Sequence, residues 1–161
     1  MLKTTGEVVE VLIERAGLTD VAQIAALFNL YRVFYRQQSN PELAQQFINE
    51  RLGNQESVIF YAKDGNGQYL GFTQLYPNFS SVSAQRTWVL NDLYVLEQAR
   101  GLGIGTLLLN RAKDFAVETK AKGIALETAE SNLQAQKLYQ SLGYKKSTGF
   151  FGYFLNLNEA Q

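Results

Sequence analysis

The stretch that decides the fold reads Gln98-Ala99-Arg100-Gly101-Leu102-Gly103-Ile104-Gly105. Before it, residues 87–95 (TWVLNDLYV) are typical of a largely buried strand, and after it apolar residues recur at helical spacing over 104–116. The three alternate glycines carry no side chain that would block a ligand, so successive backbone N–H groups can converge on an anion at the start of the helix. We therefore predict a strand, an anion-binding turn and a helix over residues 87–116.

Three alternatives for this turn differ in the residues that they require. A tight strand-to-helix turn, in which the glycines serve backbone geometry alone, remains open at this point. A P-loop would need a lysine after its last glycine, but Gly105 is followed by Thr106 and a leucine. A dinucleotide-binding fingerprint would need a third glycine, and residues 106–161 are too few to complete a doubly wound domain.

Hydrophobic periodicity and turn residues predict the elements on either side of the turn. The expected elements are a strand over 7–13, helices over 19–35 and 41–52, strands over 57–62, 69–76 and 87–95, a helix over 104–122, a strand over 124–128, a helix over 132–143 and an aromatic strand over 150–157. A hairpin is expected at 64–67, and a polar loop over 78–85. The order β-α-α-β-β-β-α-β-α-β implies a single α/β domain over 1–161, with a mixed sheet and helices on both faces.

Composition excludes several classes of function. The 161 residues include 15 basic and 15 acidic side chains, and neither cysteine nor histidine. This composition excludes disulfides, thiolate zinc sites and a Ser-His-Asp triad, and we expect no metal cofactor. Without a basic excess we expect no nucleic-acid partner. Because no run of about 18 apolar residues exists and the N-terminus lacks the features of a signal peptide, we expect no membrane partner and a cytoplasmic protein.

Two motifs carry a resemblance to a known family. The first is Arg100-x-x-Gly103-x-Gly105, and the second is Asn132-x-x-Ala135-x-x-Leu138-Tyr139-x-x-x-Gly143-Tyr144. Together they resemble the signature of the GNAT superfamily of acetyl-CoA-dependent N-acetyltransferases. The resemblance covers nearly the whole chain and implies a mostly antiparallel central sheet in three layers, with acetyl-CoA as co-substrate.

The resemblance also implies which residues bind the cofactor. The glycine turn would hold the pyrophosphate, the strand before it would supply oxyanion donors, and the asparagine of the second motif would contact the cofactor. The residues so implied are Leu93, Tyr94, Val95, Arg100, Gly101, Leu102, Gly103, Ile104, Gly105, Thr106 and Asn132. Tyr139 would be the general acid for the leaving thiolate, since a phenol is protonated at neutral pH. By periodicity alone, Tyr139 belongs to an apolar stripe.

The acceptor site is expected around Asp92. The LNDLYV stretch resembles the polyamine and histone-type branch, and related polyamine enzymes commonly carry an acidic pair where this chain has Asn91 and Asp92. Asp92 would bind the amine or accept its proton; the alternative is a buried carboxylate bonded to backbone. Tyr31, Tyr35 and Tyr76 would face the ammonium, because aromatic faces attract cations. An ordinary core role for Tyr31 and Phe72 remains open.

The residues and the resemblance together predict an N-acetyltransferase. Direct attack of a primary amine on acetyl-CoA in a ternary complex is expected, with a polyamine-like small molecule or a lysine or other amino group as acceptor. The alternatives are a non-catalytic acyl-CoA-binding module and a protein lysine or N-terminal acetyltransferase. The aromatic segment 150–157 could pair across a homodimer.

Overall fold

The computed structural model describes residues 2–4 and 7–158. It divides into two units, residues 1–127 and residues 128–161, and each unit is described by itself. The sheet and three of the α-helices belong to the first unit.

A five-stranded sheet forms the centre of the first unit, in the order β3-β4-β5-β6-β7. Its strands are β3 (Val11–Arg15), β4 (Val58–Asp64), β5 (Tyr69–Ser80), β6 (Gln85–Val95) and β7 (Ile124–Ala125). Each neighbouring pair is antiparallel except β6 and β7, which run parallel. Near the N-terminus, β1 (Leu2–Thr4) and β2 (Glu7–Val9) form a separate antiparallel pair.

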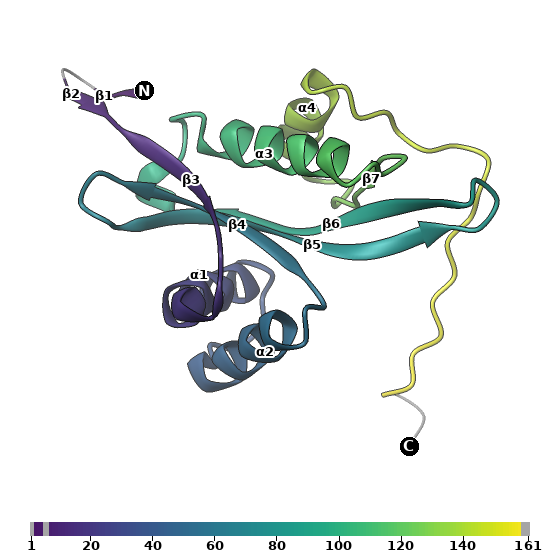
Figure 1. Ribbon diagram of the computed structural model, residues 1–161, viewed down its shortest axis with the longest axis horizontal. Coiled ribbons are helices and arrows are strands. Elements are labelled where there is room, and N and C mark those ends of the chain that lie inside the picture. Colours follow the sequence, from purple (N-terminus) through teal and green to yellow (C-terminus); the bar gives the residue numbers. More distant parts are fainter. Residues whose placement is uncertain (1, 5–6, 159–161) are drawn as a thin grey trace. The chain divides into compact units, whose positions relative to one another are not determined.

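Helices cover both faces of this sheet (Figure 1). One face carries α1 (Val21–Phe34) and α2 (Pro41–Gly53), and the opposite face carries α3 (Ile104–Glu118). Short 3-10 turns, η1 (Leu18–Asp20) and η2 (Glu97–Ala99), precede α1 and α3. The expected α/β architecture, with a mostly antiparallel sheet between helical layers, is confirmed.

Two apolar cores lie on the two faces of the sheet, as the alternation of side chains along a strand requires. On the α1 and α2 face, Phe72 of β5 lies edge-on to Phe28 of α1, with ring centroids 6.5 Å apart. On the α3 face, Phe115 contacts Phe60 of β4 and Trp88 of β6, at centroid distances of 5.5 and 5.0 Å. The central strands β4, β5 and β6 therefore contribute apolar side chains to both cores.

The start of α2 follows directly from its local sequence. The side chain of Asn40 accepts a hydrogen bond from the Leu43 N–H at 3.1 Å, and Pro41 occupies the first helical position. An asparagine cap satisfies a helix N–H that has no partner within the helix, and proline there lacks the N–H that would otherwise go unpaired. The predicted helix start is confirmed.

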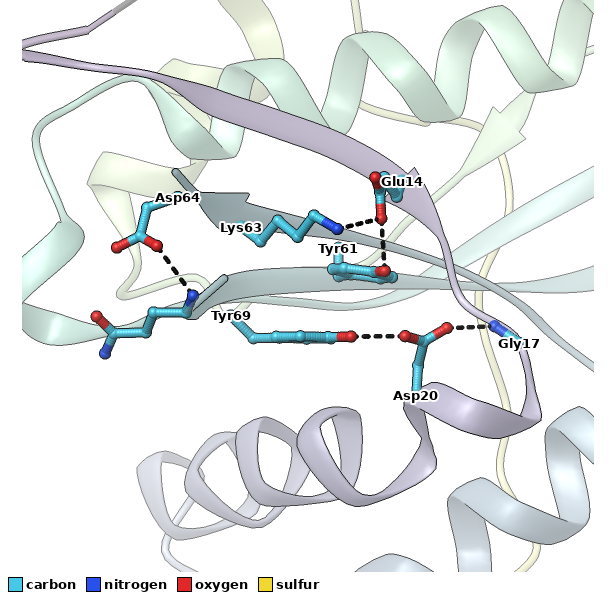
Figure 2. Close-up of polar contacts among 8 residues, drawn as sticks. Glu14, Gly17, Asp20, Tyr61, Lys63, Asp64 and Tyr69 are labelled. Carbon is cyan, nitrogen blue, oxygen red and sulfur yellow. Dashed lines mark hydrogen bonds and ion pairs between the residues drawn. The ribbon is translucent and has the colours of Figure 1, made fainter. Parts of the chain in front are cut away.

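A polar network joins β3, β4, β5 and the turn before α1 (Figure 2). The Tyr61 hydroxyl donates to Glu14 Oε2 at 2.7 Å, and Lys63 Nζ lies 2.8 Å from the same oxygen. The Tyr69 ring stacks on Tyr61 with centroids 4.4 Å apart, and its hydroxyl donates to Asp20, which also accepts from the Gly17 N–H. These contacts fix the entry of the chain into α1, the helix that carries Tyr31.

Some predicted boundaries are wrong. The loop predicted over 78–85 is shorter, because β5 continues to Ser80 and β6 begins at Gln85. The strand expected over 124–128 is reduced to Ile124–Ala125. In the second unit, α4 (Leu133–Ser141) forms as predicted.

The aromatic segment 150–157 does not form the predicted last strand. Residues 150–156 have no regular secondary structure, and the large side chains of Phe150 and Tyr153 are 94% and 95% exposed. A strand needs a neighbouring strand for its backbone hydrogen bonds, and no sheet among the described residues includes 150–156. High β-propensity alone therefore does not produce a strand here.

Candidate active site

The glycine turn before α3 has an open backbone suited to an anion. Gly101 and Gly103 adopt left-handed φ angles of 78° and 79°, which residues with a Cβ rarely adopt. Gly103 is the N-cap of α3 and provides no side-chain cap, and no hydrogen bond from another described side chain to that end of the helix occurs. The first N–H groups of α3 are therefore left to a ligand or to solvent, and the helix dipole favours a negative charge there. This geometry fits a phosphate group.

The remaining residues of the turn differ in how deeply they are buried. Ile104 is buried with 1% of its surface exposed, so its side chain anchors the turn in the core. Leu102, Gly105 and Thr106 are half-buried, and the first turn of α3 includes the last two. The predicted phosphate-binding role of these residues thus depends on their backbone N–H groups.

Arg100 adds a positive charge beside the glycine turn. Its Nε donates to the Val95 carbonyl at 3.0 Å, and its guanidinium lies 5.5 Å from the ring centroids of both Phe34 and Tyr94. These contacts tie the end of β6 to the end of α1. The residue is exposed, so its charge remains accessible to an anionic ligand.

The end of β6 directs backbone donors away from β5. Leu96 N–H donates to the Leu70 carbonyl on β5 at 2.8 Å. Because N–H groups alternate in direction along a strand, Leu93 and Val95 point theirs toward the opposite edge. The pairing of β6 with β7 ends at Val89, before these residues. Tyr94, predicted together with them, directs its N–H toward β5.

A β-bulge in β6 decides where Asp92 points. Leu90 pairs with Leu75 on β5, but Asp92 pairs with Gln74, so Asn91 is an extra residue between the two pairs. Residues 90 and 92 would share a face in a regular strand, and the extra residue moves Asp92 to the other face. That face carries α1 and α2, and the opposite face packs against α3.

Asp92 is nearly completely buried and held by polar neighbours. Its exposed fraction is 1%. Asn91 Nδ2 donates to Oδ1 at 2.8 Å, Gln74 Nε2 donates to Oδ2, and the Thr73 hydroxyl donates to the Asp92 carbonyl at 2.9 Å. Burial raises the pKa of the carboxyl group above its ordinary value, against the opposing hydrogen bonds from Asn91, Gln74 and Tyr31. A raised pKa makes a carboxylate a stronger base.

Two tyrosines share the surroundings of Asp92. The Tyr31 hydroxyl donates to the Asn91 carbonyl at 3.2 Å, which holds the bulge against α1. Burial, followed by the charge of Asp92, raises the pKa values of both Tyr31 and Tyr76. Both phenols therefore stay protonated at neutral pH. The structure thus brings together three of the four residues predicted for the acceptor site.

The other aromatic residues of α1 and β5 differ in whether they lie at the site or in the core. Tyr35 is 48% exposed at the end of α1, and its ring lies 4.9 Å from that of Tyr31, so it completes the predicted group. Phe72 is fully buried and belongs to the core. Phe79 lies further along β5, where Arg86 stacks on its ring at 5.0 Å.

Comparison with known proteins identifies the family. The family model described as "Acetyltransferase (GNAT) family" matches residues 24–144. The chain belongs to this acetyltransferase family. It is 50% identical over 145 residues to an uncharacterized N-acetyltransferase of Bacillus subtilis, covering 90% of this chain and 97% of that protein. The sequence comparisons therefore identify this chain as a member of the acetyltransferase family.

Solved structures agree with this assignment. A crystal structure of a probable acetyltransferase is 42% identical and superposes with a TM-score of 0.86, covering 91% of this chain and 97% of that one. An aminoglycoside N-acetyltransferase in complex with CoA has a TM-score of 0.78 at 16% identity, with 94% and 99% of the two chains covered, and shows the shared fold. Acetyl-CoA is the acetyl donor of this family.

The second unit carries the other motif of the acetyltransferase. Asn132 is the N-cap of α4, and its side chain accepts from the Ala135 N–H at 3.1 Å, as the sequence predicts for a cap. Tyr139 lies on the same helix, half-buried, with its ring 5.8 Å from that of Tyr144. The cofactor contact of Asn132 and the acid role of Tyr139 remain predictions.

Sequence reasoning missed Gln74 and the partnership of Asn91 with Asp92. One signal was available, because Gln74 is a polar residue inside the otherwise apolar stretch YLGFTQLY. The bulge itself has no such signal, since it depends on the pairing with β5. Among the described residues no group of three metal-ligating side chains occurs, and no described helix is both long and apolar enough to cross a membrane.

Proposed function

We propose that the protein transfers the acetyl group of acetyl-CoA to a primary amine by direct attack in a ternary complex. The observation that carries this proposal is the buried carboxylate of Asp92. It lies on the strand that ends in outward-directed N–H groups, and its described hydrogen-bond partners are neutral. An ammonium group is the natural counterion for such a carboxylate, because burying an unpaired charge is unfavourable.

Most of the residues that we propose to bind acetyl-CoA lie in the first unit. The uncapped start of α3 and the left-handed glycines fit the pyrophosphate, with Arg100 as an additional cation. The N–H groups of Leu93 and Val95 are the donors for the carbonyl oxygen on which negative charge develops. When bound, acetyl-CoA supplies the activated acetyl group as a thioester.

Asp92 and Tyr139 are the proposed groups for proton transfer. A primary ammonium has a pKa near 10, about that of a lysine side chain, and must lose a proton before it can attack. Asp92, with its raised pKa, accepts that proton directly or through water. Tyr139 donates a proton to the departing thiolate, as a phenol protonated at neutral pH can do.

The acceptor class follows from the charge and shape of the Asp92 site. Tyr31, Tyr35 and Tyr76 offer aromatic faces and hydroxyl groups beside one buried negative charge. Aromatic faces attract ammonium groups by roughly 0.5 to 2 kcal/mol. A cationic small amine of the polyamine type fits these features, and an amino group of a protein is the second candidate.

A panel of acceptors with acetyl-CoA tests the proposal. Thiol release is followed with diamines, polyamines, amino acids, aminoglycosides and lysine peptides, together with acetyl-CoA binding by calorimetry. We expect the highest kcat/KM with a small di- or polyamine and intersecting initial-rate patterns. A preference for peptides indicates a protein acetyltransferase. Tight acetyl-CoA binding without thiol release for any amine contradicts the proposal and indicates a non-catalytic acyl-CoA-binding protein.

A further inference from the structure

Gln74 is a fully buried amide whose only described hydrogen bond is made to Asp92. It lies on β5 directly opposite Asp92, and its Nε2 donates to Asp92 Oδ2. Its own Oε1 is buried and has no hydrogen-bond partner among the described residues. The amide therefore gives one hydrogen bond to the carboxylate and leaves its carbonyl unsatisfied.

Stability does not explain a glutamine at this position. A buried carbonyl without a partner destabilises the folded state, and an apolar residue of similar shape avoids that loss. The neighbours of Gln74 on β5 are Thr73 and Leu75, which are both fully buried. Local rules of folding are broken most often where a protein needs a residue for function.

Asn91 provides a second amide on the other carboxylate oxygen. Its Nδ2 donates to Oδ1 of Asp92 at 2.8 Å, so each oxygen of the carboxylate receives one amide N–H. The two amides come from different strands, β5 and β6. Asn91 reaches this position because it is the extra residue of the bulge, and Tyr31 holds its carbonyl from α1.

We propose that Gln74 and Asn91 are positioning residues that form an amide clamp, which holds Asp92 in one orientation and keeps it ionised for the acceptor amine. The inference rests on the proposed role of Asp92 in handling that amine. Amides suit this task because they donate hydrogen bonds to a carboxylate without carrying a charge. An arginine or lysine in their place would neutralise the carboxylate and compete with a cationic substrate.

The amide clamp opposes the effect of burial on the ionisation of Asp92. Burial favours the neutral carboxylic acid, and hydrogen bonds from Asn91, Gln74 and Tyr31 favour the carboxylate. The other titratable groups that face the site are the tyrosines Tyr31 and Tyr35 at the end of α1 and Tyr76 of β5, and the cation Arg51 of α2 acts on Tyr76. With one amide removed, Asp92 should stay protonated to a higher pH, where it neither attracts an ammonium nor accepts its proton.

The first experiment replaces Gln74 by methionine, which keeps the length of the side chain and removes the donor. A hydrogen bond to a charged group typically contributes enough to shift a pKa by about 1 to 2 units. We therefore expect the acidic limb of the pH profile of kcat/KM to move to higher pH by about that amount. At pH values below the wild-type limb kcat/KM should fall about tenfold or more relative to the wild type, and it should recover toward the wild-type value in alkaline solution.

The matched control is Gln45→Met, the same substitution on the exposed surface of α2. It should leave the profile unchanged. Asn91→Ala removes the donor to the other carboxylate oxygen at an exposed position and serves as the second variant if Gln74→Met does not fold. It should move the limb in the same direction. A loss of rate equal at all pH values, without movement of the limb, indicates a purely structural role and overturns the inference.

Carbon-13 NMR of the Asp92 carboxyl group tests the clamp without any substrate. The signal is assigned with Asp92→Asn and titrated in the wild type, Gln74→Met and Asn91→Ala. We expect the midpoint to rise in both variants, and an unchanged midpoint overturns the inference. A raised midpoint in a protein that acetylates no amine supports the effect on Asp92 ionisation and refutes the proposed acceptor reaction.

Discussion

The two halves of β6 differ in nearly every property although they belong to one strand. The first half, up to Leu90, pairs with β5 on one edge and with β7 on the other, and its Trp88 packs against Phe115 of α3. The second half, from Asn91 to Val95, pairs with β5 but lies beyond the pairing with β7. It carries a buried carboxylate on the face of α1 and α2.

The bulge at Asn91 separates these halves. Before it, Leu90 faces the α3 core; after it, Asp92 faces Gln74 and the tyrosines. One inserted residue thus converts a core strand into a candidate active-site strand. Its first half should therefore respond to substitution mainly through stability, and its second half mainly through activity.

The largest stability effect is expected for Leu90→Ala. Leu90 is 3% exposed and pairs with the fully buried Leu75, so the substitution leaves a cavity and should lower the free energy of unfolding by about 2 to 5 kcal/mol. Urea denaturation measures this loss. The kcat/KM of the remaining folded enzyme should change little at low temperature. A variant that is stable but inactive would contradict the division of β6.

For Tyr139→Phe we expect a loss of kcat of about 10- to 1000-fold, toward the lower end of what a positioned general acid contributes. The substitution keeps the ring that contacts Tyr144 and removes only the hydroxyl group, so acetyl-CoA affinity should hold. Stopped-time assays of thiol release at saturating substrate measure the effect. Wild-type turnover would assign Tyr139 to packing alone.

Gly71→Ala tests how closely β5 must approach the second half of β6. A Cβ at Gly71 would lie 2.7 Å from the Tyr94 carbonyl oxygen and 3.2 Å from Val95 Cα. The backbone of β6 must then move, which should lower the free energy of unfolding by about 1 to 3 kcal/mol and also displace the proposed Leu93 and Val95 donors. We expect reduced kcat in addition to reduced stability. Gly65→Ala, where a Cβ meets nothing within 4 Å, is the control.

Asp92→Asn should lower kcat/KM for the best amine by at least about tenfold, or about 1.4 kcal/mol. The substitution keeps the shape of the side chain and removes its charge, and the loss should shrink at high pH, where more amine is already deprotonated. Calorimetric affinity for acetyl-CoA should hold. The control is Asp114→Asn, on the exposed surface of α3. Unaltered kinetics in folded Asp92→Asn would reject Asp92 as the amine-handling group.

Asp92→Asn should also change how the stability of the folded protein depends on pH. Burial raises the pKa of Asp92 in the folded protein, so the folded state binds its proton more tightly than the unfolded state does. The stability from this group is complete below its unfolded pKa and is lost as the pH rises through the folded pKa. Asp92→Asn should therefore be at least as stable as the wild type at neutral pH, and this relative gain should disappear in acid. Thermal unfolding across pH measures it.

The smallest effect is expected for Thr73→Val. Thr73 is fully buried, and its hydroxyl donates to the Asp92 backbone carbonyl at 2.9 Å. Valine keeps the shape and removes this hydrogen bond, which should lower the free energy of unfolding by about 1 kcal/mol. The pH profile of kcat/KM should stay in place, because the bond is made to the backbone and not to the carboxylate.

Local signals in the sequence predicted most of the helices and strands, and they predicted the glycine turn before α3. The cap and proline at Asn40 and Pro41 marked the start of a helix, and the glycines marked the turn before α3. Each of these signals depends on the few residues around it. The prediction of a last strand over 150–157 was wrong, because a strand also needs a pairing partner elsewhere in the chain.

The motifs in the sequence were enough to identify the family, and the glycine turn and one acid, Asp92, in the strand before it are visible in the sequence alone. Only the tertiary structure decided which face Asp92 occupies. A regular alternation would place it with Trp88 and Leu90 against α3, and the bulge places it with Gln74. The physical reason is that a bulge is a property of two paired strands: its position depends on the register with β5, which no stretch of β6 encodes alone.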